Sequence, residues 1–313
     1  MLPIASSARR IPSQRLLALP LAVACLVVCL SGCHVLTPHP IAVTQQHIDP
    51  DLICRSEPQI EVGRPNKFLD TVGWVVGIPG KVILWDRRVD NHAVSDQTIG
   101  TVAEYLHTNH LPHVKVRANQ YAPLEDFQRL RKNEAVAWPY RYTLGLLSVA
   151  QGAVLPGRIF GGDHYNPYTQ TINLYSDIPA IAVHEGAHAK DFTRRELQGT
   201  YALAYQFVPL WHETIANEDA LAYVHASGDR GRIVEANRIL YPAYGTYVGN
   251  SVGYFFPSAG VPIYIAAVGA GHVNGRALND ELDKQLPFQS ITYQHHQEST
   301  SNAQMVSHSE MLE

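Results

Sequence analysis

Two histidines and a glutamate with a fixed spacing are the clearest chemical feature of the sequence. His184, Glu185 and His188 form the pattern H-E-x-x-H in a segment that is expected to be helical. Residues four apart lie on one face of a helix, so both imidazoles can bind one tetrahedral Zn²⁺. Glu185, beside the first ligand, can reach a water molecule on the metal and is the candidate general base. Gly186 costs a helix about 1 kcal/mol relative to alanine, which indicates close approach of another backbone.

A second expected helix, 209–226, carries the candidates for a third ligand. Its Glu213 and Asn217, taken with H-E-x-x-H, resemble the gluzincin group of zinc metallopeptidases. In that group a downstream helical Glu completes the site, and an Asp four residues later often holds a ligand histidine. The resemblance covers about residues 170–222. It implies Glu213 as the third ligand, with Asn217 in place of Asp. Glu218 is the alternative ligand, because it follows Asn as in the Asn-Glu pattern of thermolysin-like enzymes.

The resemblance also implies a mechanism and a fold. One Zn²⁺ per chain, held by three side chains, would keep a position for water, and Glu185 would take its proton during hydrolysis of a peptide or protein substrate in the cell envelope. The implied fold is α+β and zincin-like, with a small mixed sheet over the H-E-x-x-H helix and a helix-rich C-terminal half. A peptide substrate would pair with an edge strand. That strand is expected to be Thr171, Ile172, Asn173, Leu174 and Tyr175, which alternate with period two just before the motif helix.

Two other functions stay open. One is a non-catalytic envelope lipoprotein with a structural zinc site, which Asn217 in place of Asp supports. The other is a zinc amidase that acts on cell-wall material. Asp191 follows His188 by three residues, so it either accepts an imidazole N–H behind the metal or pairs with Arg194 or Arg195. The other histidines, His212 among them, are expected in the core or on the surface, and no single tyrosine stands out as an oxyanion donor.

The N-terminus has the features of a lipoprotein signal peptide. Residues 1–15 carry three arginines and no acid, and residues 16–30 are uncharged and apolar, a run too short to cross a membrane comfortably. The Leu-Ser-Gly-Cys that ends at Cys33 resembles the bacterial lipobox. We therefore expect cleavage after residue 32 and an acylated Cys33 in the lipid bilayer. The next residue, His34, is not the Asp that favours inner-membrane retention, so the expected location is the outer membrane, facing the periplasm.

Composition limits the remaining function classes. Apolar residues make up 46% of the chain and charged residues 17%, which is too apolar for a disordered protein. The net charge is −4 and no long basic run occurs, so nucleic-acid binding is not expected.

The mature chain divides into three expected parts. Proline-rich residues 33–66 form a tether, 67–287 form the metallopeptidase-like domain, and 288–313 form a disordered tail. Residues 239–275 contain no charged side chain, and three of their glycines are spaced by four. We expect two buried helices there, with contact to a protein or a membrane as the alternative.

Further elements follow from turn residues and periodicity. Strands are expected at 74–76, 81–85 and 114–116. Helices are expected at 96–108 after Ser95, at 124–132, and at 178–197 with Asp177 as its cap, and a loop is expected at 161–167.

Overall fold

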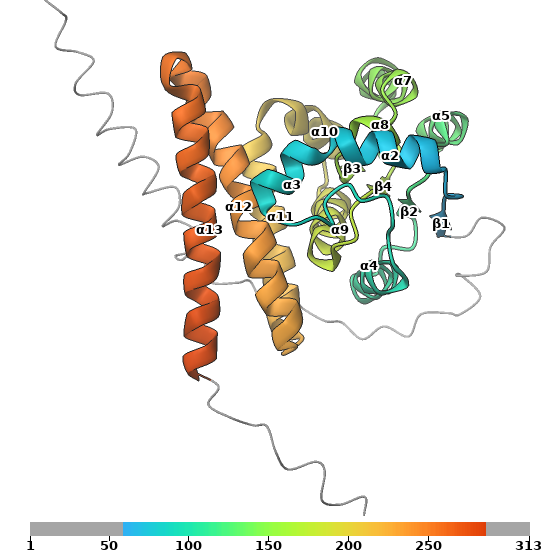
Figure 1. Cartoon of the computed structure of the whole chain (residues 1–313). Coiled ribbons are helices and arrows are strands. Elements are labelled where there is room, and N and C mark those ends of the chain that lie inside the picture. The colour runs from blue at the N-terminus through green and yellow to red at the C-terminus, as the bar shows by residue number, and fades with distance from the viewer. Residues whose placement is uncertain (1–58, 286–313) are drawn as a thin grey trace, which may run out of the picture. The chain divides into compact units, whose positions relative to one another are not determined.

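The computed structural model describes residues 59–285, apart from the side chains of residues 204–207 and 285. Cys33, the expected signal peptide, most of the expected tether and the expected tail at 288–313 lie outside the described residues. The chain divides at Gly275 into two units, and the fold described here is that of the first. Its architecture is α+β, as expected (Figure 1).

One four-stranded sheet forms the centre of this unit. Its order is β1 (Ile60–Val62), β2 (Lys115–Ala118), β4 (Thr171–Leu174) and β3 (His164–Asn166), with the first two pairings parallel and the last antiparallel. Because β4 lies between β2 and β3, the prediction that residues 171–175 form an edge strand is wrong. The edge strand on that side is β3, which forms within the expected loop at 161–167.

Strand β1 corrects the start of the domain. It lies in the segment 33–66 that we expected to be a tether, yet it pairs with β2. The side chain of Gln59 donates to the backbone oxygens of Leu111 and Val114, at 2.9 and 3.1 Å. The fold therefore includes residues from Gln59 onward. Three residues are too few to show the alternation by which a strand is predicted.

The two faces of the sheet differ in chemistry, because alternate residues point to opposite sides. One face is apolar, and its ring of Tyr165 lies 6.0 Å from the ring of Phe192 on α9 (Pro179–Arg194). The other face is polar, and its Arg117 pairs with Glu125 and Asp126 of α5 (Pro123–Lys132). The motif helix α9 and helix α5 therefore cover opposite faces of the sheet.

The first two helices replace two expected strands. Residues 74–76 belong to α2 (Lys67–Val76) and residues 81–85 largely to α3 (Ile78–Leu84). Runs of Val and Ile favour strands, but hydrogen bonds at the N-terminus of α2 stabilise a helix here instead. The side chain of Asn66 accepts from the backbone N–H of Leu69 at 3.1 Å, and Asp70 accepts from the N–H of Asn66 at 2.8 Å. Such reciprocal bonds satisfy free donors at a helix start.

Helix α4 (Asp96–Thr108) has the expected bounds and the expected N-cap, Ser95. Asp177 does not cap α9, whose N-cap is Ile178 without a side-chain bond. Its carboxylate instead accepts from the hydroxyl of Ser95 at 2.6 Å and from that of Thr98 at 2.7 Å. Asp177 thus fixes the start of α4 against the segment that leads into α9.

Shorter helices follow α5 along the chain. They are α6 (Trp138–Tyr140), the π-helical turn η3 (Arg141–Gly145), α7 (Leu146–Val154) and α8 (Gly157–Phe160). The C-terminal half is helical, as expected. After α9 come α10 (Gln198–Phe207), α11 (Pro209–Ala226), α12 (Arg230–Phe255), the 3₁₀ turn η4 (Pro257–Ala259) and α13 (Gly260–Gln285).

The glycine-rich segment forms a close helix pair. A Cβ on Gly245 or Gly249 would lie 2.6–2.7 Å from backbone atoms of Ala267 or Tyr264 on α13. The expectation of two packed helices is therefore confirmed, but the pair is not fully buried, because Tyr254 stays 81% exposed. No helix among the described residues has both the length and the apolarity to span a membrane.

Candidate metal centre

Packing of α11 against α9 positions the site. Ala216 and Ala220 of α11 are fully buried, and such small side chains let two helices approach closely. Two imidazoles of α9, His184 and His188, lie one turn apart and face Glu213 of α11. The predicted ligands therefore come together, each from the helix on which it was expected.

The three side chains present their ligand atoms at short mutual distances. Nε2 of His184 lies 3.0 Å from Oε2 of Glu213 and 3.2 Å from Nε2 of His188, and the latter nitrogen lies 3.3 Å from Oε1 of Glu213. Tetrahedral zinc with ligands at 2.0–2.1 Å separates neighbouring ligand atoms by about 3.3–3.4 Å. The side chains are also buried, at 9%, 1% and 5% exposure. This donor set fits a zinc ion.

The geometry selects Glu213 rather than Glu218. The two residues are five apart, which separates them by about 140° around the helix. Among the described residues, the group that could hold a metal contains Glu213 and not Glu218. The first choice made from the sequence is the one that the fold brings to the histidines.

Contact between the two helices shifts the pKa values of Glu213 and His184 in opposite directions. Burial raises the pKa of Glu213, but the charge of His188 and the hydrogen bonds from both imidazoles outweigh it and hold that pKa well below its usual range. Burial lowers the pKa of His184, but Glu213 and the charge of Glu185 outweigh it and raise that pKa above its ordinary value. The carboxylates thus favour positive charge between the two helices, which is the charge that a metal ion carries.

Glu185, the predicted general base, is 6% exposed and is not one of the three ligands. Its charge acts on His184 and also on Tyr247 of α12. The carboxylate of Glu185 is therefore near enough to act on the metal group. The residue before it, His184, makes the contact with Glu213.

Tyr247 is a residue at the candidate site that the sequence did not single out. Burial raises its pKa well above the ordinary value, and the charges of Glu213 and Glu185, with a hydrogen bond to Glu213, raise it further. Other tyrosines are engaged elsewhere. The hydroxyl of Tyr201 donates to Asp191 at 2.8 Å, and that of Tyr244 lies 2.8 Å from the hydroxyl of Thr214. Tyr247 differs from these tyrosines because the packing of α12 brings it to Glu213. No pattern in the sequence predicts that packing.

Asn217 was expected to hold a ligand histidine. Its polar side chain contributes to the raised pKa of His184, but its amide oxygen forms no hydrogen bond within the described part of the chain. Its amide donates to the backbone oxygen of Leu240 on α12, at 3.2 Å. The residue thus connects the ligand to a third helix, which the Asp of the gluzincin pattern could not do with the same bond.

Asp191 follows the second of its two expected roles. Its carboxylate accepts from Arg195 at 2.7 Å and from the hydroxyl of Tyr201 at 2.8 Å, so the ion pair is the observed contact. His212 is 1% exposed, and burial lowers its pKa to about 4. As expected, it is a core histidine and not a member of the metal group.

Comparison of the chain with family models, with curated proteins and with solved structures finds no match. The chemistry of the site therefore has to be argued from its own residues.

Proposed function

We propose that this protein is a zinc-dependent peptidase of the bacterial cell envelope. One observation carries the proposal: three buried ligand atoms of His184, His188 and Glu213 converge at zinc-binding distances, and the charge of Glu185, the residue after His184, acts on that imidazole. A chance H-E-x-x-H would require no carboxylate from another helix at the imidazoles. The two buried histidines and the buried carboxylate also have the charge balance of a catalytic zinc site with three protein ligands.

Each residue has a separate role in this proposal. His184, His188 and Glu213 hold the ion, which when bound supplies a water of lowered pKa and polarises a substrate carbonyl. Glu185 accepts a proton and later returns it to the nitrogen of the leaving amine. Tyr247 donates to Glu213 and keeps that carboxylate in place, and the side-chain oxygen of Asn217 would serve as an acceptor for the imidazole N–H of His184.

The deciding experiment measures zinc content and peptide cleavage on the same samples. Glu185→Gln keeps the shape of the side chain and removes its basicity. We expect this variant to bind one zinc per chain and to lose cleavage by a factor on the order of 10²–10⁴. Glu134→Gln, an exposed change outside the site, is the matched control and should keep both. Full cleavage, or full complementation of a deletion strain, by Glu185→Gln would refute the peptidase.

The burial of all three ligands favours one alternative, a structural zinc site in a non-catalytic lipoprotein. Structural sites are closed, whereas catalytic sites keep an open position. The alternative predicts that Glu185→Gln has no effect in cells in which His184→Ala has one. The same pair of variants therefore separates the two functions.

The proposed location rests on the N-terminal sequence. We propose that Cys33 is acylated and anchors the domain to the outer membrane. Cys33→Ala should then prevent lipid labelling and leave an unprocessed precursor. Labelling that survives this change contradicts the anchor without affecting the zinc proposal.

A further inference from the structure

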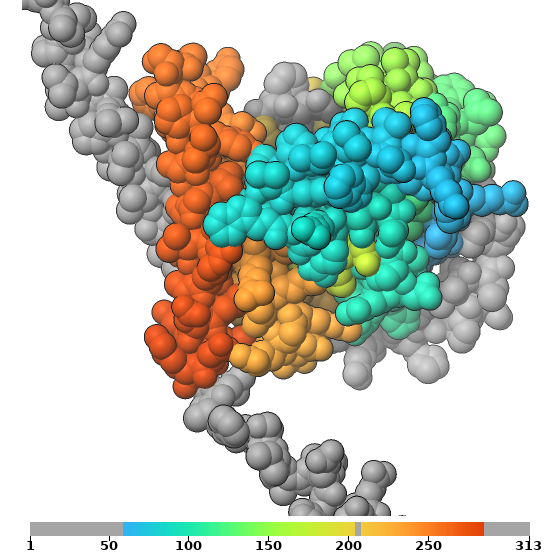
Figure 2. Space-filling view, viewed as in Figure 1, coloured from blue at the N-terminus to red at the C-terminus, as the bar shows by residue number. Residues whose placement is uncertain are grey.

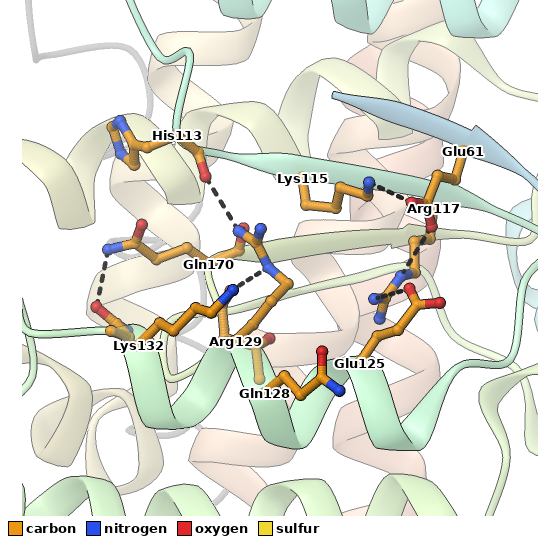
Figure 3. Close-up of a pocket in the computed structure, with 11 residues that line it drawn as sticks. Glu61, His113, Lys115, Arg117, Glu125, Gln128, Arg129, Lys132 and Gln170 are labelled. Carbon is orange, nitrogen blue, oxygen red and sulfur yellow. Dashed lines mark hydrogen bonds and ion pairs between the residues drawn. The ribbon is translucent and has the colours of Figure 1, made fainter. Parts of the chain in front are cut away.

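A cavity of about 520 Å³ lies on the polar face of the sheet, the face that α5 covers (Figure 3). The motif helix α9 lies on the other face, so the cavity is separate from the metal centre. Its wall is formed by β1, β2, α5 and the residues before β4. Its charged lining residues are Glu61, Lys115, Arg117, Glu125, Arg129 and Lys132.

Two of the lining cations are buried within the wall and are balanced there. Lys115 pairs with Glu61. Arg117, only 1% exposed, pairs with Glu125 at 2.9 Å and also with Asp126. The ion pairs of Arg117 hold α5 against the sheet. In these pairs and that of Lys115, the carboxylates that border the cavity are already bound to cations of its wall.

The other two cations lie on α5 and point into the same space (Figure 3). The guanidinium of Arg129 donates to the backbone oxygens of Thr169, Gln170 and His113, at 2.8, 3.0 and 3.0 Å. Those acceptors fix the position of the guanidinium, whose charge also acts on Asp126. Within the described part of the chain, the exposed Lys132 forms no ion pair.

The charge balance of the lining is therefore positive. Four cations face three carboxylates when Asp126, which pairs with Arg117, is counted with the two lining acids, 4 − 3 = +1, in a chain whose net charge is −4. Burial lowers the pKa of His113 at the cavity, and the charge of Arg129 lowers it further. A concave surface with an excess of positive charge attracts anions.

From the lining and its charge, we propose that this cavity binds a small polyanion that carries phosphate or carboxylate groups. Arg129 and Lys132 supply the charge, and the amide of Gln128 supplies a further donor. The volume lies in the range of about 300–1,000 Å³ in which proteins bind small molecules. Arginine held in a fixed position suits planar or tetrahedral oxyanions, because little side-chain entropy is lost on binding.

Titration calorimetry on the full-length protein tests this proposal. Inorganic phosphate and citrate are added separately, each compared with sodium chloride at equal ionic strength. We expect saturable binding of at least one of the two anions, and the one that binds identifies the ligand class. Because both anions can interact with zinc, the titrations are run on zinc-loaded and on chelator-treated protein. The affinity should be the same in both, so the result is independent of the proposed peptidase.

A matched pair of charge reversals localises the binding. Lys132→Glu should weaken it by on the order of tenfold. Arg131→Glu changes the adjacent exposed residue of α5, which does not line the cavity, and should leave the affinity within about twofold of wild type. Three results would each overturn the proposal. They are a lack of saturable binding with both anions, equal weakening by the two charge reversals, and binding that requires zinc.

Discussion

The ring of Tyr105 fills the space that a side chain at Gly186 would need. A Cβ on Gly186 would lie 2.6 Å from Cδ1 of Tyr105. Tyr105 is fully buried on α4, and its hydroxyl donates to Asp219 of α11, which also pairs with Lys190 of α9. We expected another backbone at this glycine, and the structure places an aromatic ring there instead. The motif helix is thus held from the side opposite its histidines.

Gly186→Ala should therefore destabilise the protein although alanine favours helix. The gain in helix propensity is about 1 kcal/mol, but overpacking of a rigid buried ring costs about 1–3 kcal/mol. We expect a net loss on the order of 1 kcal/mol in the free energy of unfolding in urea. Gly100→Ala in α4 is the control, because nothing lies within 4 Å of its Cβ position. That variant should be as stable as wild type or more so. Equal effects of the two substitutions would contradict the role of Tyr105.

The metal ligands give a second prediction. His184→Ala, His188→Ala and Glu213→Ala should each abolish stoichiometric zinc after dialysis, because each removes one of the three converging ligand atoms. Glu218→Ala should keep nearly all of it. Elemental analysis of the purified variants measures this directly. Zinc that is lost with Glu218→Ala and kept with Glu213→Ala would mean that α11 is rotated from its position in the fold.

The elements around the site follow from sequence because their signals are local. Helix α11 has the predicted bounds, and α4 begins after its predicted cap, Ser95. The candidate ligand set follows from the spacing of His184 and His188 together with the gluzincin resemblance, which implies Glu213 on the second helix. Hydrophobic periodicity and capping residues suffice to predict the bounds of a helix that is long and begins with a polar cap or a proline.

What the sequence could not provide depends on contacts between distant segments. Strand β3 exists because it pairs with β4, and that pairing moves β4 to the inside of the sheet. Asp177 binds Ser95, the cap of α4, rather than capping α9, since the two segments meet only in the fold. Tyr247 reaches Glu213 through the packing of α12. In each case a contact with another element of the fold decides the role.

The pH dependence of stability gives a third prediction, at Asp163. Burial raises the pKa of this carboxyl to about 6, and the charge of Asp90 adds to the effect. A carboxyl whose pKa is higher in the folded state binds more protons there than in the unfolded state. Its contribution to stability is therefore present at low pH and falls as pH rises from about 4 to about 6.

Asp163→Asn should remove this dependence, because the amide oxygen can still accept from the backbone N–H groups of Tyr175 and Ser176. The residue is partly exposed, so we expect a gain on the order of 2 kcal/mol over wild type at pH 7 and little difference near pH 4. Urea unfolding of both proteins at the two pH values measures the difference. An unchanged difference between the two pH values would contradict the raised pKa.

The fourth prediction concerns the departure from the gluzincin pattern at Asn217. The amide of this residue donates to the backbone oxygen of Leu240 at 3.2 Å, and the residue is 6% exposed. Asn217→Asp replaces that donor with an acceptor that faces a carbonyl, and a buried unsatisfied polar group costs about 1–3 kcal/mol. We expect the zinc-free variant to lose stability by that amount in urea.

Zinc affinity should respond differently, because a carboxylate at 217 would still support His184. Asn217→Asp should bind zinc at least as tightly as wild type, while Asn217→Ala, which supports neither neighbour, should bind it about 10–100-fold more weakly. Competition with a zinc chelator measures both affinities. Stability and affinity that fall together in Asn217→Asp would show that the asparagine is needed at the metal itself. A loss of stability alone assigns the asparagine to the contact between α11 and α12, and explains why this chain departs from Asp.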